Sequence, residues 1–170
     1  MTRTEQIAVA NSTNRTRGAV GKNAVVPRVV RDLIPQGHIV LDFGSGREAQ
    51  HAVALRADGW KLVDAWEFGA NHNENHVSTL DHRERYYDCI YASNVLNVQS
   101  DAFMLKDTLE TIGNLMHHAG SFICNYPQSP RKSDLSTGDV QGILEFMFNR
   151  VDRVKGTSGP VWVCKGYRGF

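Results

Sequence analysis

Apolar and polar positions along the chain alternate between two spacings, which predict helices and strands in turn. Segments with apolar residues three or four positions apart predict helices over 25–33, 47–58, 101–118 and 139–148. Asp139 is expected to cap the last of these helices. Short apolar runs predict strands over 38–43, 60–66, 76–80, 87–94 and 121–126.

The order of these segments predicts the architecture. Strands that alternate with helices favour an α/β fold, a doubly wound and mostly parallel sheet with helices on both faces. Two short runs near the C-terminus, 150–154 and 161–164, are joined by a Gly-containing link and predict an antiparallel hairpin. Ligands of such sheets bind outside the carboxyl ends of the strands. The residues that follow the predicted strands are therefore the candidates for function.

Composition adds the domain organisation. The chain of 170 residues is long enough for one core, and we expect a single domain over 21–170. The polar segment 1–20 is expected to be a flexible N-terminal arm. The net charge of +1 gives no overall attraction for nucleic acid or an anionic membrane.

The three cysteines, Cys89, Cys124 and Cys164, are far apart, and each lies in an apolar run. This pattern favours reduced core cysteines in a cytoplasmic protein rather than a disulfide framework. No Cys/His spacing typical of a metal site occurs, so no metal is predicted. No apolar stretch is long enough to span a bilayer.

The candidate chemistry begins at 42–46, Asp-Phe-Gly-Ser-Gly, between the first predicted strand and a helix. A Gly-x-Gly turn at this place lets the backbone approach a ligand. With Ala49 the turn formally fits a dinucleotide pattern, and Glu67 follows the second strand where such sites hold a ribose. However, Asp42 would repel a pyrophosphate, whereas it would attract a cationic ligand. S-adenosylmethionine has a sulfonium, an ammonium group and no phosphate, and it suits this charge.

The chain resembles the class I S-adenosylmethionine-dependent methyltransferases. Residues 39–46 resemble that family's first motif, and 87–98 resemble its fourth-strand segment. The resemblance covers about 22–166 and implies a Rossmann-like fold, S-adenosylmethionine as cofactor and methyl transfer by in-line displacement. It implies cofactor contacts from Asp42, Phe43, Gly44, Ser45, Gly46, Glu67, Asp81, Ser93 and Asn94. The run 95–98 is also similar to methyltransferases of bacterial DNA modification systems, which suggests a bacterial or phage type.

The chain departs from the family at several points. Glu48 and Ala49 replace the third small residue of the first motif. The Asp/Asn-Pro-Pro-Tyr/Phe motif of amino-directed DNA methyltransferases and the Pro-Cys nucleophile of cytosine C5 enzymes are both missing. The acceptor is therefore open among a small molecule, a protein side chain and a nucleic-acid base.

Acceptor-side residues are predicted from the segments around the strand ends. Arg17, Asn97 and Tyr126 are expected to face the acceptor. His72 and His76 are candidates for a general base, with solvated loop histidines as the alternative. Basic residues in the arm and near 131–132 would favour an anionic acceptor or nucleic acid, with solvated charge as the alternative. The sequence leaves the oligomeric state open.

Two other functions compete with methyl transfer. The first is an NAD-dependent oxidoreductase, which Asp42 opposes and for which no Tyr-x-x-x-Lys signature is present. The second is a non-catalytic S-adenosylmethionine-binding module, or a subunit that needs a partner to complete its acceptor site.

Overall fold

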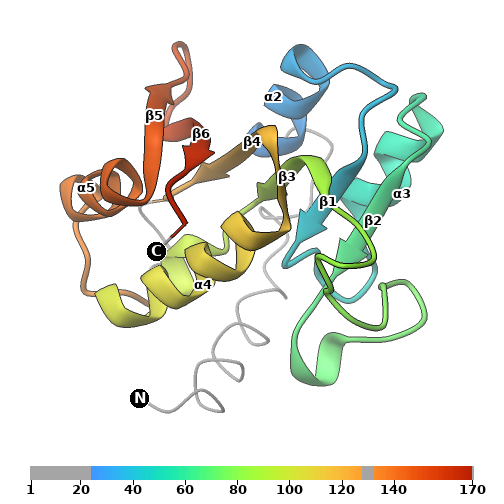
Figure 1. Cartoon of the computed structure of the whole chain (residues 1–170), viewed down its shortest axis with the longest axis horizontal. Coiled ribbons are helices and arrows are strands. Elements are labelled where there is room, and N and C mark those ends of the chain that lie inside the picture. The colour runs from blue at the N-terminus through green and yellow to red at the C-terminus, as the bar shows by residue number, and fades with distance from the viewer. Residues whose placement is uncertain (1–23, 128–131, 170) are drawn as a thin grey trace.

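The computed structural model describes residues 24–127 and 132–169 (Figure 1). The longer elements are the helices α2 (Val25–Leu33), α3 (Gln50–Ala57), α4 (Ala102–Leu115) and α5 (Thr137–Met147) and the strands β1 (Val40–Phe43), β2 (Val63–Trp66), β3 (Tyr87–Ala92), β4 (Met116–Asn125), β5 (Phe148–Arg153) and β6 (Val161–Tyr167). Two short 3₁₀ helices, η2 (Gly69–Asn71) and η3 (Leu96–Val98), follow β2 and β3.

The strands form one sheet in the order β2-β1-β3-β4-β6-β5. The first four strands are parallel, whereas β6 runs antiparallel to both β4 and β5. The predicted mostly parallel sheet with a terminal hairpin is therefore confirmed. Because β1 lies between β2 and β3, the residues that follow these three strands meet at one edge.

Both faces of the sheet are covered (Figure 1). Leu41 and Ile90 point to the face that α4 and α5 cover, whereas Val40 and Tyr91 point to the face that α2 and α3 cover. This double burial explains why the first strand reads as an unbroken apolar run. All three cysteines are buried and free of disulfides, as predicted for core cysteines. Within the described residues, no helix has the length and apolar character needed to cross a bilayer.

The strand predicted over 76–80 is wrong, because this segment has no strand structure. Its link to β2 is a hydrogen bond from the Val77 N–H to the Ala65 carbonyl, at 2.9 Å. The imidazoles of His72 and His76 hydrogen-bond to nearby backbone, and such contacts compete with a strand ladder.

Helix boundaries also differ from the prediction. The helix α3 begins at Gln50 and not at 47, because Ala49 has φ 47° and cannot belong to a right-handed helix. Ser136 caps α5 in a capping box, so Asp139 lies at the third helical position and the predicted Asp139 cap is wrong.

Candidate functional site

The turn 44–46 joins β1 to the segment before α3, and its N–H groups all point back into the protein. The Gly44 and Ser45 N–H groups donate to the Trp66 carbonyl at 2.9 and 3.0 Å. The Gly46 N–H donates to Glu67 Oε2 at 2.6 Å. A phosphate-binding turn would direct such donors at its ligand. In this protein the three N–H groups donate instead to Trp66 and Glu67 at the end of β2.

Glycine is required at both ends of the turn. Gly44 and Gly46 each have φ 77°, in the left-handed region that residues with a Cβ rarely adopt. A Cβ on Gly44 would lie 2.6 Å from Cγ2 of Val95, so the turn packs tightly on the loop after β3. A Cβ on Gly46 would meet nothing within 4 Å. The turn is therefore packed at Gly44 and borders open space at Gly46.

Asp42 is a buried carboxylate with an unsatisfied oxygen. Its side chain is 1% exposed, and Oδ2 has no hydrogen-bond partner. Burial raises the pKa of Asp42 to about 7, the nearby Tyr91 hydroxyl opposes this rise, and the Glu67 charge adds to it. Tyr91 is its register neighbour on β3, and the Tyr91 hydroxyl is close enough to lower the pKa of Asp42. Neither Asp42 Oδ2 nor the Tyr91 hydroxyl has a hydrogen-bond partner of ordinary geometry. A buried carboxyl oxygen without a partner fits a ligand that brings a cationic donor.

Glu67 is the second buried carboxylate, at 1% exposure. Its Oε1 accepts from the Phe68 N–H at 2.8 Å, while Oε2 accepts from the Gly46 N–H. The predicted pair Asp42 and Glu67 thus brackets the glycine turn. Phe43 lies between them along the chain, and its ring packs into the core against Phe68 at 5.4 Å.

Both predicted histidines lie in the loop beside the turn, with rings 5.4 Å apart. His76 Nδ1 accepts from the Asn73 N–H at 3.0 Å, and Nε2 lies 2.9 Å from the Gly46 carbonyl oxygen. His72 Nε2 lies 2.9 Å from the Val77 carbonyl oxygen. Because backbone groups occupy both nitrogens of His76, this geometry gives it a structural contact and offers no lone pair for a base.

The ends of β3 and β4 are joined by an amide pair. Asn94 has φ 58°, and its N–H donates to Asn125 Oδ1 at 2.8 Å. In return Asn125 Nδ2 donates to Asn94 Oδ1 at 2.8 Å. Ser93 precedes this pair and is half-buried. Asn125 is a site residue that was not predicted, although its place at the end of a parallel strand is a signal that could have identified it.

Asp81 is a half-buried acid beside β2 and β3. It lines a pocket of about 370 Å³ together with Asp64 and Tyr87, which belong to the first half of β2 and the start of β3. Its carboxylate pairs with Arg83 at 3.0 Å, which lowers the pKa of Asp81. Glu67 is not among the residues that line this pocket. A cofactor contact from Asp81 therefore stays a prediction.

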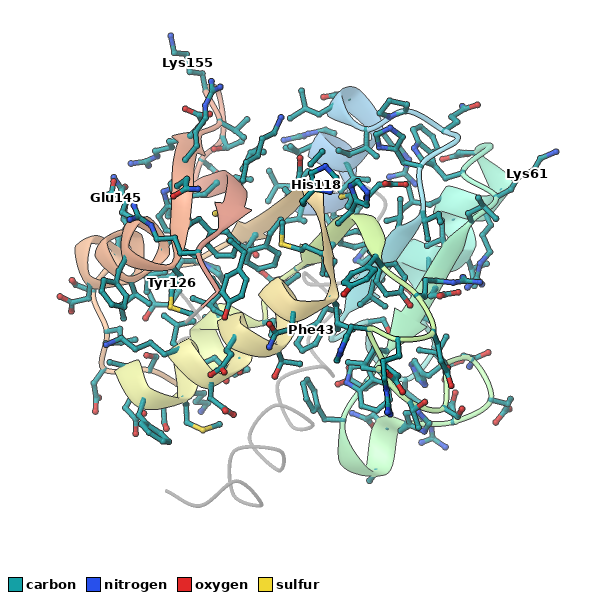
Figure 2. The ribbon with its side chains drawn as sticks, viewed as in Figure 1. Phe43, Lys61, His118, Tyr126, Glu145 and Lys155 are labelled. Atoms are coloured by element: carbon teal, nitrogen blue, oxygen red, sulfur yellow. The ribbon has the colours of Figure 1, made fainter. Side chains whose placement is uncertain are left out.

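Of the predicted acceptor-side residues, Tyr126 needs correction. Its side chain, labelled in Figure 2, is fully buried in the core with residues of α4 and α5. Its hydroxyl donates to the Leu135 carbonyl. It directly follows β4, its N–H donates to the Pro160 carbonyl at 3.2 Å, and its ring packs inside the protein, so it does not face an acceptor. Asn97 is 2% exposed within η3, and its carbonyl accepts from the Lys132 N–H at 2.8 Å. Arg17 lies outside the described residues.

In the described ranges, no three His, Cys, Asp or Glu side chains are grouped to hold a metal ion. The buried carboxylates beside the glycine turn are Asp42 and Glu67.

Comparison with known proteins finds similarity in structure only. No protein-family model matches the chain, and no curated protein matches its sequence. The structure of DesVI from Streptomyces venezuelae superposes with a TM-score of 0.65 at 8% identity, over 98% of this chain and 99% of that one. The magnesium protoporphyrin IX methyltransferase of Synechocystis with bound S-adenosylmethionine superposes with a TM-score of 0.58 at 16% identity, over 96% and 82%.

A TehB-like S-adenosylmethionine-dependent methyltransferase from Corynebacterium glutamicum also superposes, with a TM-score of 0.55 at 13% identity, over 97% of this chain and 100% of that one. At such identities the likeness concerns the fold. The chain has the Rossmann-like fold that is found in S-adenosylmethionine-dependent methyltransferases.

Proposed function

We propose that this protein is an S-adenosylmethionine-dependent methyltransferase. One observation carries the proposal: two buried carboxylates, Asp42 and Glu67, bracket a glycine turn whose N–H groups are all used internally. Such a site repels a pyrophosphate and attracts a ligand with a cationic end and free hydroxyl groups. The methyltransferase of Synechocystis, which shares the fold, has been solved with S-adenosylmethionine and with S-adenosylhomocysteine.

Each part of this cofactor would have a partner among the described residues. Asp42 would hold the ammonium group through the oxygen that has no partner. The open space at Gly46 would admit the methionine part. The Glu67 carboxylate would accept hydrogen bonds from the ribose hydroxyls. Phe43, Ser45, Ser93 and Asn94 would complete the site through their positions at the ends of β1 and β3.

Methyl transfer from S-adenosylmethionine requires mainly that the protein position the reactants. The acceptor's lone pair forms a bond to the methyl carbon while the carbon–sulfur bond breaks, and its electrons neutralise the sulfonium. The cofactor is already activated, so an enzyme can act by aligning acceptor, methyl and sulfur and by excluding water. A general base is needed only where the acceptor carries a proton that must leave. The acceptor class stays open among small molecules, protein side chains and nucleic-acid bases.

Isothermal titration calorimetry tests the proposal with S-adenosylhomocysteine and NAD as competing ligands. We expect S-adenosylhomocysteine to bind and NAD to give no heat of binding, because the Asp42 carboxylate would repel a pyrophosphate and the N–H groups of the turn are bonded internally. Binding of NAD without S-adenosylhomocysteine would replace the proposal with the oxidoreductase alternative. A Glu67→Gln variant should bind S-adenosylhomocysteine about tenfold more weakly, since a charged acceptor is lost.

One observation favours a second candidate, a cofactor-binding module without its own catalytic base. Both nitrogens of His76 are bound to backbone, and His72 also contacts a backbone carbonyl. Incubation with tritiated S-adenosylmethionine and fractionated cell extract separates the two candidates. Labelled product indicates an enzyme, whereas cofactor binding without transfer in any fraction indicates a module that needs a partner.

A further inference from the structure

Because α3 begins late, the backbone carbonyls of Gly46 and Arg47 lie outside the helix. Residue Ala49 is left-handed, and α3 begins only at Gln50. From its own segment, 45–49, the Gly46 carbonyl accepts two long hydrogen bonds, from the Ala49 N–H and the Ser45 hydroxyl at 3.3 Å each. These carbonyls therefore need other donors to hold them in place.

Side chains of the loop 73–76 supply those donors. Asn73 Nδ2 donates to the Arg47 carbonyl at 3.0 Å, and Asn75 Nδ2 donates to the same carbonyl at 3.3 Å. His76 Nε2 contacts the Gly46 carbonyl at 2.9 Å. Three side chains from one short loop thus converge on two successive carbonyls some thirty residues away.

The contacts of His76 determine its tautomer. The Asn73 N–H can only donate, so Nδ1 must accept, and the Gly46 carbonyl can only accept, so Nε2 must carry the proton. Only the neutral ring protonated at Nε2 satisfies both partners. The side chain is 9% exposed, so little water competes for these bonds.

We propose that His76 is a positioning residue for the cofactor turn, which it holds through the Gly46 carbonyl. Glu67 fixes the N–H of the same residue, so Gly46 is held from both sides. The inference rests on the proposed function, because it assigns His76 to the turn that would bind S-adenosylmethionine. His76 does not touch the ligand in this role.

The physical reason is preorganisation. Gly46 has no side chain and lies in the left-handed region, so its backbone loses much conformational freedom when it is ordered. A turn that is ordered before the ligand arrives spares the ligand that cost. Glu48 and Ala49 replace the third small residue of the motif, and α3 begins only at Gln50. The contacts from the loop 73–76 therefore hold backbone carbonyls that no early helical turn stabilises.

Two isosteric variants test the proposal. His76→Gln keeps an amide nitrogen near the place of Nε2, whereas His76→Asn keeps only an acceptor near the place of Nδ1. We expect His76→Gln to bind S-adenosylhomocysteine like the wild type and His76→Asn to bind about tenfold more weakly. The matched controls His82→Gln and His82→Asn change an exposed histidine six residues further on and should leave the affinity unchanged.

A second readout does not depend on the ligand. Amide hydrogen exchange of Gly46, measured by NMR on the free protein, should be faster in His76→Asn than in His76→Gln. Long-range proton–nitrogen correlation spectra of the wild type should show a neutral ring protonated at Nε2. The proposal is overturned if the ring carries its proton at Nδ1, or if both variants match the wild type in Gly46 exchange.

The outcomes separate this inference from the proposed function. If the wild type binds no S-adenosylhomocysteine, the proposed function fails, and the Gly46 exchange rates still decide the role of His76. If the wild type binds and His76→Asn binds equally well, the function stands and the positioning role is wrong.

Discussion

At the scale of single residues, Asp42 shows how burial changes the meaning of a motif. In the sequence, the charge of Asp42 favours a cationic ligand. In the structure, the carboxyl is also buried and has a pKa of about 7. Ionising a buried carboxyl is unfavourable, and such groups are common at functional sites, where a bound ligand stabilises the charge.

The stability of the protein should therefore depend on Asp42. A folded-state pKa raised from 3.8 to about 7 favours the folded state at low pH, and this contribution is lost as the pH rises toward 7. Asp42→Asn removes the group that titrates. Between pH 5 and 8 the variant should gain about 2–3 kcal/mol of unfolding free energy relative to the wild type, measured by urea denaturation. A difference that is constant over this range would contradict the assigned burial.

The same group should make ligand affinity depend on pH in the opposite sense. Below pH 7 most Asp42 is protonated and cannot attract an ammonium group, so S-adenosylhomocysteine affinity should rise about tenfold from pH 6 to 8. Asp42→Asn should bind more weakly and show no such rise. Adenosine, which lacks the ammonium group, is the control ligand. Calorimetric affinities that stay flat for the wild type would refute the role of Asp42.

Tyr126 gives a prediction from the correction reported above. Its hydroxyl donates to the Leu135 carbonyl inside the core. Tyr126→Phe keeps the ring and should lower the unfolding free energy by about 1 kcal/mol without changing S-adenosylhomocysteine affinity. Unchanged stability together with a lost affinity would return Tyr126 to the ligand site.

At the scale of elements, periodicity predicted helices and strands well where local order decides them. The helix over 25–33 has its predicted bounds, and the fourth predicted strand contains β3. The failures occur where side chains bind backbone. The 76–80 segment uses its hydrogen bonds in a loop, and Ala49 delays α3 through one left-handed residue.

The capping box of α5 is a test at this scale. Ser136 Oγ accepts from the Asp139 N–H, and Asp139 accepts from the Ser136 N–H. Ser136→Ala should lower the unfolding free energy by about 1 kcal/mol, read from urea denaturation. Thr137→Ser changes the neighbouring position without removing the cap and serves as the control. Equal losses from both variants would mean that Ser136 contributes no cap.

At the scale of the whole molecule, the strand order decides which parts are most protected. The strands β3 and β4 lie at the centre of the sheet, and helices cover both faces there. Amide hydrogen exchange should be slowest in Ile90, Tyr91, Phe122 and Ile123 and faster in the edge strands β2 and β5. Slower exchange at the edges than at the centre would contradict the strand order.

The arrangement of the whole molecule also explains which site residues could be predicted. Gly44 and Glu67 directly follow β1 and β2, and Gly46 lies two residues after Gly44. The rule that parallel strands bind ligands at their carboxyl ends selects all three from the sequence. The partners of those residues lie far along the chain. Asn125 meets Asn94, and His76 meets Gly46, only because the fold brings distant segments together.

The sequence by itself determined the parallel sheet, the glycine turn and the acids beside it. Hydrophobic spacing over a few residues defines each element, and the order of the elements along the chain defines the sheet. The tertiary structure decided how these groups behave. Burial between packed layers set the pKa of Asp42, packing under α4 and α5 enclosed Tyr126 in the core, and two backbone contacts engaged both nitrogens of His76. Desolvation and hydrogen bonding depend on neighbours in space, and a linear pattern does not contain those neighbours.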